Sequence, residues 1–241
     1  MATPEYGETW VYESIIGAVP GVNVPTWLAL ALQFGLFEAG VIVLSLIYDL
    51  SAGIVAGTVA VTVATAGSVA MLRISRLVRD ANAPESYRHL LFGSSVEVVL
   101  GVVSFVGIVT YLFAFDATEP TLVTQLLGPE PPVLATYLTL LVLWDLCYRI
   151  GTGWWASVTG LWRSVRCDLD ATAARRLRRA DLETMAFGLL QLALVPFVIA
   201  HPLLLVAIVG HVVAVVTVTA LSLAVLRRRA GSGGGLTTSS P

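Results

Sequence analysis

The chain has 241 residues, of which 56% are hydrophobic and only 12% are charged, with a net charge of −2. Soluble domains carry roughly 25% charged residues, so this composition excludes an ordinary soluble protein and indicates a chain embedded in a lipid bilayer. All 14 basic residues are arginines, which excludes chemistry that needs a lysine amine, such as a retinal Schiff base.

Residues 1–25 form an N-terminal segment that we expect on the cytoplasmic side. A short interfacial helix over Thr9–Ala18, with its aromatic rings at headgroup level, is one interpretation. A flexible acidic tail is the other. Pro20, Gly21 and Pro25 end the segment in either case.

Six apolar runs follow, each near the roughly 20 residues that a helix needs to cross a bilayer. The last two are divided at His201-Pro202, because proline disfavours helix in the residue before it. We therefore predict an all-α, polytopic membrane bundle over residues 26–229, and a disordered Gly/Ser/Thr tail over 230–241. The predicted spans are Trp27–Tyr48, Gly53–Leu72, Leu91–Phe115, Val133–Gly153, Thr184–Ala200 and Leu203–Leu226.

Arginine placement predicts the orientation of the bundle. The connections after the first, third and fifth spans carry acidic residues and His201, but no arginine. The positive-inside rule then places both termini in the cytoplasm, with three hairpins pointing outward from the cell membrane. The arginines follow the second, fourth and sixth spans: Arg73, Arg76, Arg79, Arg88; Arg163, Arg166, Arg175, Arg176, Arg178, Arg179; Arg227, Arg228 and Arg229.

The hairpins share a sequence feature that has two interpretations. Phe-Gly is followed by a carboxylate or an amide in the first helix of each hairpin, at Phe34-Gly35, Phe92-Gly93 and Phe187-Gly188. Three related repeats would produce this pattern. The spacing slips by one residue in the middle copy, so a chance recurrence stays open.

The basic residues are all arginines. The spans are rich in valine, alanine and threonine, and the connections without arginine carry carboxylates. In this overall character the chain resembles uncharacterised multi-pass integral membrane proteins of haloarchaea. The resemblance extends over the whole chain without a diagnostic motif. It implies a membrane location and no particular activity.

Small residues predict which helices pack centrally, because they let backbones approach closely in lipid. Two spans carry such stripes, and Gly151-Thr152-Gly153 predicts a kink or a helix end. The stripes are Gly53, Gly57, Ala60, Ala64 and Gly67 in the second span, and Ala207, Gly210, Ala214 and Thr217 in the sixth.

Charged residues inside the spans are the main functional signal, because a charge at membrane depth costs at least roughly 2.5–3.5 kcal/mol. Asp145 and Arg149 stand four residues apart and share a helix face. Glu38 and Glu97 fall at comparable depths. One hypothesis gathers all four in a polar cluster. The alternative is a self-paired structural bridge between Asp145 and Arg149, with Glu38 bonded to a neighbouring helix and Glu97 in reach of water.

Two further polar residues, Gln191 and His211, are candidates to line such a site, although a lone histidine there also suits a packing role. The fourth connection predicts a cytoplasmic helix over Asp170–Glu183. Its arginines are expected to contact anionic lipid headgroups, at roughly 1 kcal/mol each. These arginines are Arg163, Arg166, Arg175, Arg176, Arg178 and Arg179.

The spans carry no zinc motif and no serine–histidine pair at matching depth, so the sequence does not favour an enzyme. We expect no metal, no cofactor and no nucleic-acid partner. The first hypothesis for function is a small carrier or channel-like protein with an intramembrane polar cluster. The second is a non-catalytic scaffold or accessory subunit that binds partner helices and anionic lipid. A homo-oligomer and a membrane-protein partner are both open.

Overall fold

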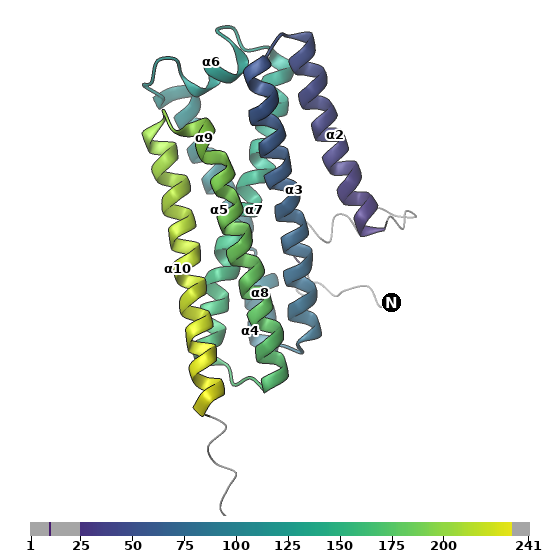
Figure 1. Ribbon diagram of the computed structural model, residues 1–241, viewed down its shortest axis with the longest axis vertical. Helices are drawn as coiled ribbons and strands as arrows, with labels where there is room; N and C mark the ends of the chain where they lie inside the picture. The colour runs from purple at the N-terminus through teal and green to yellow at the C-terminus, as the bar shows by residue number, and fades with distance from the viewer. Residues whose placement is uncertain (1–9, 11–24, 233–241) are drawn as a thin grey trace, which may run out of the picture.

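A computed structural model gives the fold of Trp10 and residues 25–232, with side chains described to Arg229 (Figure 1). All regular elements in residues 25–232 are helices, without a strand, so the predicted all-α class is confirmed for this part of the chain. The elements are α2 (Thr26–Ile47), α3 (Ser51–Asp80), α4 (Glu85–Phe92), α5 (Val96–Thr110), the π-helical turn η1 (Tyr111–Phe115), α6 (Leu122–Leu127), α7 (Val133–Arg166), α8 (Ala171–Leu190), the 3₁₀ turn η2 (Gln191–Leu194), α9 (Val195–Val198) and α10 (Pro202–Ser232).

Six helical segments are long and apolar enough to cross a membrane, which confirms the predicted number of spans. Five of them exceed the predicted length, among them α3 with 30 residues and α7 with 34. The expected separate helix over Asp170–Glu183 is continuous with the fifth span. Asp170 caps that helix by accepting hydrogen bonds from the backbone N–H groups of Thr172 and Ala173.

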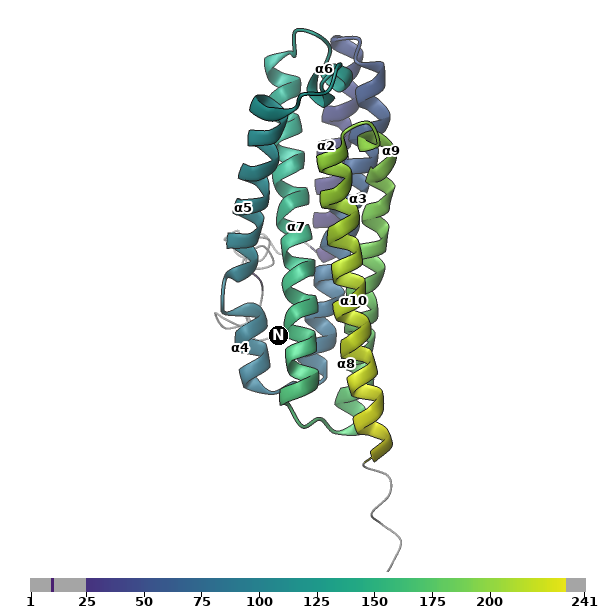
Figure 2. The same cartoon turned by 90° about the vertical axis from the view of Figure 1, so that its left-hand side faces the viewer.

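Helix α7 is the centre of the bundle. It packs against α2, α3, α5, α8 and α10, and α5 and α10 lie on either side of it (Figure 2). One row of its buried positions recurs at alternating intervals of three and four residues, the spacing that places side chains on one helix face. These positions are Val142, Leu146, Arg149, Gly153, Ala156, Gly160 and Arg163.

A helix end at Gly151–Gly153, one of the two predictions for these residues, is wrong, because α7 continues through them to Arg166. The glycines serve close packing instead. A Cβ atom on Gly151 would lie 3.0 Å from the backbone nitrogen of Gly101 and 3.1 Å from the Cβ of Leu100. Helices α5 and α7 therefore approach almost backbone to backbone at this point.

The small-residue stripe of α3 packs centrally, as predicted. A Cβ on Gly57 would lie 2.7 Å from Val41 of α2, and one on Gly67 would lie 2.7 Å from Phe187 of α8. The corresponding prediction for α10 is wrong: a Cβ on Gly210 would meet nothing within 4 Å. The face that α10 buries carries larger residues, Leu204, Val212, Val215 and Leu226.

Two local breaks shape the remaining spans. The third span is interrupted between α4 and α5, where Ser95 adopts the left-handed conformation with φ 54°. In the fifth span the α-helix tightens to the 3₁₀ turn η2 just before Pro196. Proline lacks an N–H and its ring clashes with the carbonyl four residues earlier, which accounts for this change.

The two ends of the bundle differ in charge. The α3–α4 and α7–α8 connections lie at the same end as the C-terminal end of α10; we call this the arginine end. The α2–α3 turn, α6 and the α9–α10 turn lie at the other, which we call the α6 end (Figure 1). The expected interfacial helix over Thr9–Ala18 and the tail beyond Ser232 lie outside the described residues, except for Trp10. That indole is fully buried and packs edge-to-face on Phe92, with ring centroids 5.0 Å apart.

Candidate functional site

A cavity of about 510 Å³ lies in the half of the bundle nearer the α6 end. Helices α5 and α10 supply walls on either side of α7 (Figure 2), and α6 contributes to the lining. Sites for small molecules typically enclose roughly 300–1,000 Å³ and are mostly apolar, so this cavity has the size and character of a ligand site. Representative lining residues are Val103, Ile108, Leu126, Leu143, Leu204 and Ile208.

Polar groups in the lining are few. Among the described residues that line the cavity, none is an aspartate, a glutamate or an arginine. The hydroxyl groups of Tyr111 and Thr139 already donate hydrogen bonds, to Asp116 at 3.2 Å and to the carbonyl oxygen of Ala135 at 2.8 Å. Ser104 and Thr136 contribute two further hydroxyl groups. Two buried side-chain nitrogens of the lining have no hydrogen-bond partner among the described residues, and they belong to Gln191 and His211, both singled out from the sequence.

Gln191 opens the 3₁₀ turn η2 and is 1% exposed. Its Nε2 has no hydrogen-bond partner among the described residues, and the side chain lines the cavity. A buried donor without an acceptor costs roughly 1–3 kcal/mol. The fifth span therefore presents an unsatisfied amide to an otherwise apolar cavity.

His211 of α10 lines the same cavity. Its ring packs near the indole of Trp154, with centroids 6.2 Å apart, in agreement with a packing role. Its Nε2 also has no hydrogen-bond partner among the described residues. The imidazole thus combines a packing contact with a free polar atom.

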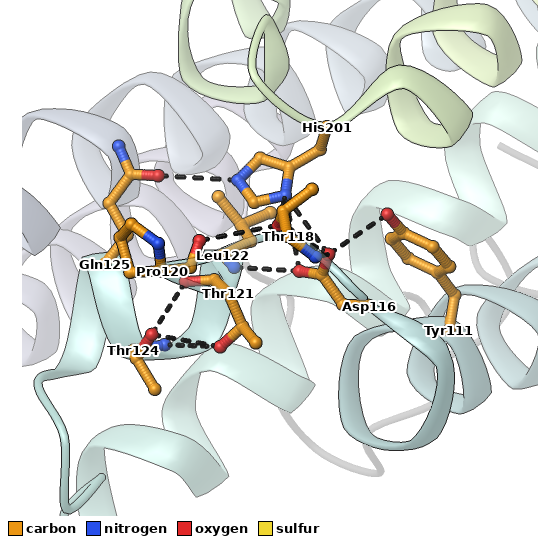
Figure 3. A network of polar contacts seen from close by, with 9 residues as sticks. All are labelled: Tyr111, Asp116, Thr118, Pro120, Thr121, Leu122, Thr124, Gln125 and His201. Atoms are coloured by element: carbon orange, nitrogen blue, oxygen red, sulfur yellow. Dashed lines mark hydrogen bonds and ion pairs between the residues drawn. The ribbon is translucent and has the colours of Figure 1, made fainter.

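A network centred on Asp116 lies at the α6 end (Figure 3), and two of its members, Tyr111 and Leu122, also line the cavity. Its carboxylate accepts hydrogen bonds from the Thr118 hydroxyl at 2.6 Å and from the Leu122 backbone N–H at 2.9 Å. The ring of His201 reaches the same carboxylate and lies 2.8 Å from the Thr118 hydroxyl. Because Leu122 begins α6, these bonds fix α6 in place.

Burial alone would raise the pKa of Asp116. Hydrogen bonds donated by Thr118 and by the Leu122 N–H outweigh burial and hold the pKa of this carboxyl well below its ordinary value. Sequence reasoning assigned Asp116 and His201 only to outer connections. The two residues are 85 positions apart, and no local pattern links them.

The structure forms the predicted bridge between Asp145 and Arg149. The guanidinium lies 2.6 Å from the carboxylate, and the arginine side chain is fully buried. Gln33 of α2 donates a further hydrogen bond to Asp145 at 3.0 Å. The two charges therefore neutralise each other at the contact of α7 with α2 and α3.

The predicted cluster of four does not form. Glu38 accepts a hydrogen bond from Thr58 of α3 at 2.6 Å, as its alternative interpretation expected. Glu97 lies on α5, where its backbone carbonyl oxygen would be 3.3 Å from a Cβ on Gly151. Because Gly151 and Arg149 are two residues apart on α7, they point to nearly opposite sides of the helix. Glu97 is therefore separated from the bridge.

The expectation that Glu97 reaches water is also wrong, because this residue is 0% exposed. Neither of its carboxyl oxygens has a hydrogen-bond partner among the described residues. The close approach of α5 and α7 at Gly101 and Gly151 explains this burial, since it leaves no space between the two helices.

Arg163 does not contact lipid headgroups, contrary to the prediction. Its side chain is 0% exposed and lies 2.8 Å from the Asp181 carboxylate of α8. Ser222 of α10 also donates a hydrogen bond to Asp181 at 2.8 Å, and the guanidinium lies 5.0 Å from the centre of the Tyr87 ring. This network joins α4, α7, α8 and α10 near the arginine end.

The other predicted headgroup residues lie near the arginine end. Arg166, Arg175, Arg176 and Arg179 are exposed, and Arg178 is half-buried. Arg176 donates a hydrogen bond to the backbone carbonyl of Asp80. Their contact with lipid stays a prediction.

Six apolar helices long enough to span a membrane, with α7 packed among the other five, indicate a multi-pass integral membrane protein. Within that class, the chain belongs to DUF7530, a family of unknown function whose sequence profile matches residues 5–222. Neither the curated proteins nor the solved structures contain a match to it.

Proposed function

We propose that this protein binds and carries a small lipophilic molecule within the bilayer, in the cavity between α5, α7 and α10. The observation that supports this proposal is the cavity itself: about 510 Å³ of apolar space with Gln191 and His211 in its lining. An apolar pocket with a few polar groups is the usual form of a small-molecule site.

The proposed carrier site is therefore the cavity, and no longer the predicted polar cluster around Asp145 and Arg149. Arg149 and Asp145 neutralise each other. Glu97 belongs to α5, which packs against a different face of α7. A polar pathway needs groups that can exchange partners with a solute, whereas Asp145 and Arg149 are held in fixed contacts. The same proposal includes a cell-membrane location, a haloarchaeal source and an orientation with both termini in the cytoplasm. With that orientation the cavity lies in the outer half of the bilayer.

Photolabelling in lipid nanodiscs tests the proposal, with an alkyl diazirine as the apolar probe and peptide mapping of the labelled sites. We expect labels on residues that line the cavity. Gly107→Phe should suppress them, because Gly107 lines the cavity and its Cβ position is open. Gly210→Phe is the matched control, since Gly210 is equally open but lies outside the cavity lining. Labelling spread evenly over the lipid-facing surface, and unchanged by Gly107→Phe, would refute the proposal.

A second candidate function is a scaffold held by anionic lipid. A surface groove of about 400 Å³ near the arginine end is lined by Arg73, Arg76 and Arg179, and Arg73 pairs with Glu183 at 2.7 Å. Such arginines attract anionic headgroups. Replacing Arg76 and Arg179 by Gln should reduce the anionic lipid that co-purifies with the protein, while the same change at Arg227 and Arg228, outside the groove, serves as control.

A further inference from the structure

We infer that the ligand is an uncharged lipophile with a carbonyl group at one end, and that Gln191 donates the hydrogen bond that holds this group. The inference rests on the proposed function and adds the chemical class of the ligand. Its basis is the amide of Gln191, which is 1% exposed, lines the cavity and leaves Nε2 without an acceptor among the described residues.

The chemistry of the amide selects the ligand atom. A glutamine Nε2 carries two N–H donors and no acceptor, so it needs an oxygen or nitrogen lone pair. Carbonyl oxygens supply such lone pairs without adding a donor of their own. A ligand that is apolar throughout would leave the amide without an acceptor and would lack the roughly two- to tenfold gain in affinity that one hydrogen bond supplies.

The lining argues against a charged ligand. Carboxylates, phosphates and ammonium groups are costly to bury without a counter-charge, and the described lining contains no aspartate, glutamate or arginine. Asp116 lies at the α6 end but is already engaged by Thr118, Leu122 and His201. The acceptor on the ligand is therefore a neutral one.

The shape of the cavity assigns the apolar part of the ligand to the α6 end. Along α10 the lining runs from Leu203 to His211, a rise of roughly 12 Å at 1.5 Å per residue. Leu126 and Leu127 of α6 line the cavity at the end remote from His211. A hydrocarbon chain or ring system fills this length, with the carbonyl near Gln191 and the Nε2 of His211 available as a second polar contact.

A structural role for Gln191 would leave a different signature. An amide that stabilises a helix contact is paired on both its oxygen and its nitrogen, whereas this one is not. Leucine at this position would remove the unsatisfied donor, and such replacements are neutral or stabilising. Gln191→Leu should therefore weaken binding of the carbonyl ligand while the protein stays as stable as before.

The test uses two photoprobes that share one alkyl diazirine chain, one ending in a methyl ketone and the other in a plain alkyl group. In the parent protein in nanodiscs, we expect the ketone to label the cavity roughly two- to tenfold more efficiently, the range for one hydrogen bond. Gln191→Leu should abolish this preference and leave alkane labelling intact. Gln191→Met serves as a second variant without a donor if the leucine variant does not fold. Thr217→Leu, at an exposed polar residue of α10 that does not line the cavity, is the control.

The outcomes separate the two proposals. If both probes label the cavity equally in the parent, or if the ketone preference survives Gln191→Leu, the inference about the ligand is wrong while the proposed function stands. If neither probe labels the cavity above the lipid-facing surface, the proposed function fails and the inference fails with it. A carboxylate-ended probe that labels the cavity as well as the ketone does would also overturn the neutral-ligand inference.

Discussion

The carboxylate of Asp116 and the imidazole of His201 lie 3.3 Å apart, and both side chains are 1% exposed. They connect the end of the third span to the turn before the sixth. The same carboxylate accepts the Leu122 N–H at the start of α6. This contact therefore ties three segments together at the α6 end.

The stability of the α6 end should depend on pH through Asp116. Its pKa is depressed in the folded protein, so the stabilisation is fully present above the ordinary carboxyl pKa of about 3.9. It is lost as the pH falls through the folded pKa. We expect thermal unfolding in nanodiscs to shift to lower temperature when the pH is lowered below about 4.

Asp116→Asn should flatten this dependence of the unfolding temperature on pH. Glu119→Gln, at an exposed neighbouring carboxylate, should follow the parent, and a curve for Asp116→Asn as steep as the parent's would contradict the prediction.

The bridge between Asp145 and Arg149 should behave as one unit in a double-mutant cycle. Asp145→Asn or Arg149→Met alone should lower the free energy of unfolding by about 3–5 kcal/mol, because each leaves one charge uncompensated. The double variant should recover much of that loss. Unfolding in nanodiscs measures all three variants. Additive losses would show that the two residues act independently.

Arg163 should be among the most sensitive positions near the arginine end. Arg163→Met leaves the buried Asp181 carboxylate without its partner, so we expect a loss of about 3–5 kcal/mol in the free energy of unfolding. Arg166→Met, one turn along the same helix and exposed, should change it by no more than about 0.5 kcal/mol. Equal effects at the two positions would be incompatible with a buried Arg163.

The contact of α5 with α7 can be tested at Gly151. Gly151→Val places methyl groups where even a Cβ lies 3.0 Å from the Gly101 nitrogen. Because backbone atoms cannot move aside cheaply, we expect a loss of about 1–3 kcal/mol. Thermal unfolding of Gly151→Val against Gly210→Val, an open position on α10, gives the comparison. A fully stable Gly151→Val would rule out this close approach.

The features that follow from local spacing were predictable from the sequence. Six apolar runs define six spans. The i,i+4 spacing of Asp145 and Arg149 brings them together whatever surrounds them. Gly57 and Gly67 mark the packed face of α3 because their spacing follows the helix period.

Sequence reasoning missed the residues of α7 that stay buried after its apolar run ends. Arg163 was read as one member of a basic cluster, although it continues the buried three–four spacing that passes through Arg149 and Ala156 of α7. Extending that period past Gly153 would have found it. The contact of Asp116 with His201 has no such signal, because it depends on how separate helices are arranged in space. The cavity likewise exists only through the packing of α5, α7 and α10.

The length of α3 and α7 has a practical consequence. At about 1.5 Å per residue, 30 and 34 residues extend about 45 and 51 Å, whereas a bilayer's hydrocarbon core is about 30 Å thick. Rods of this length project beyond the lipid, where the Arg163–Asp181 contact cross-links α7 to α8. A fluorophore or an antibody fragment attached to such a projection would move as one body with the membrane-embedded helices. It would give single-particle imaging a landmark outside the detergent belt.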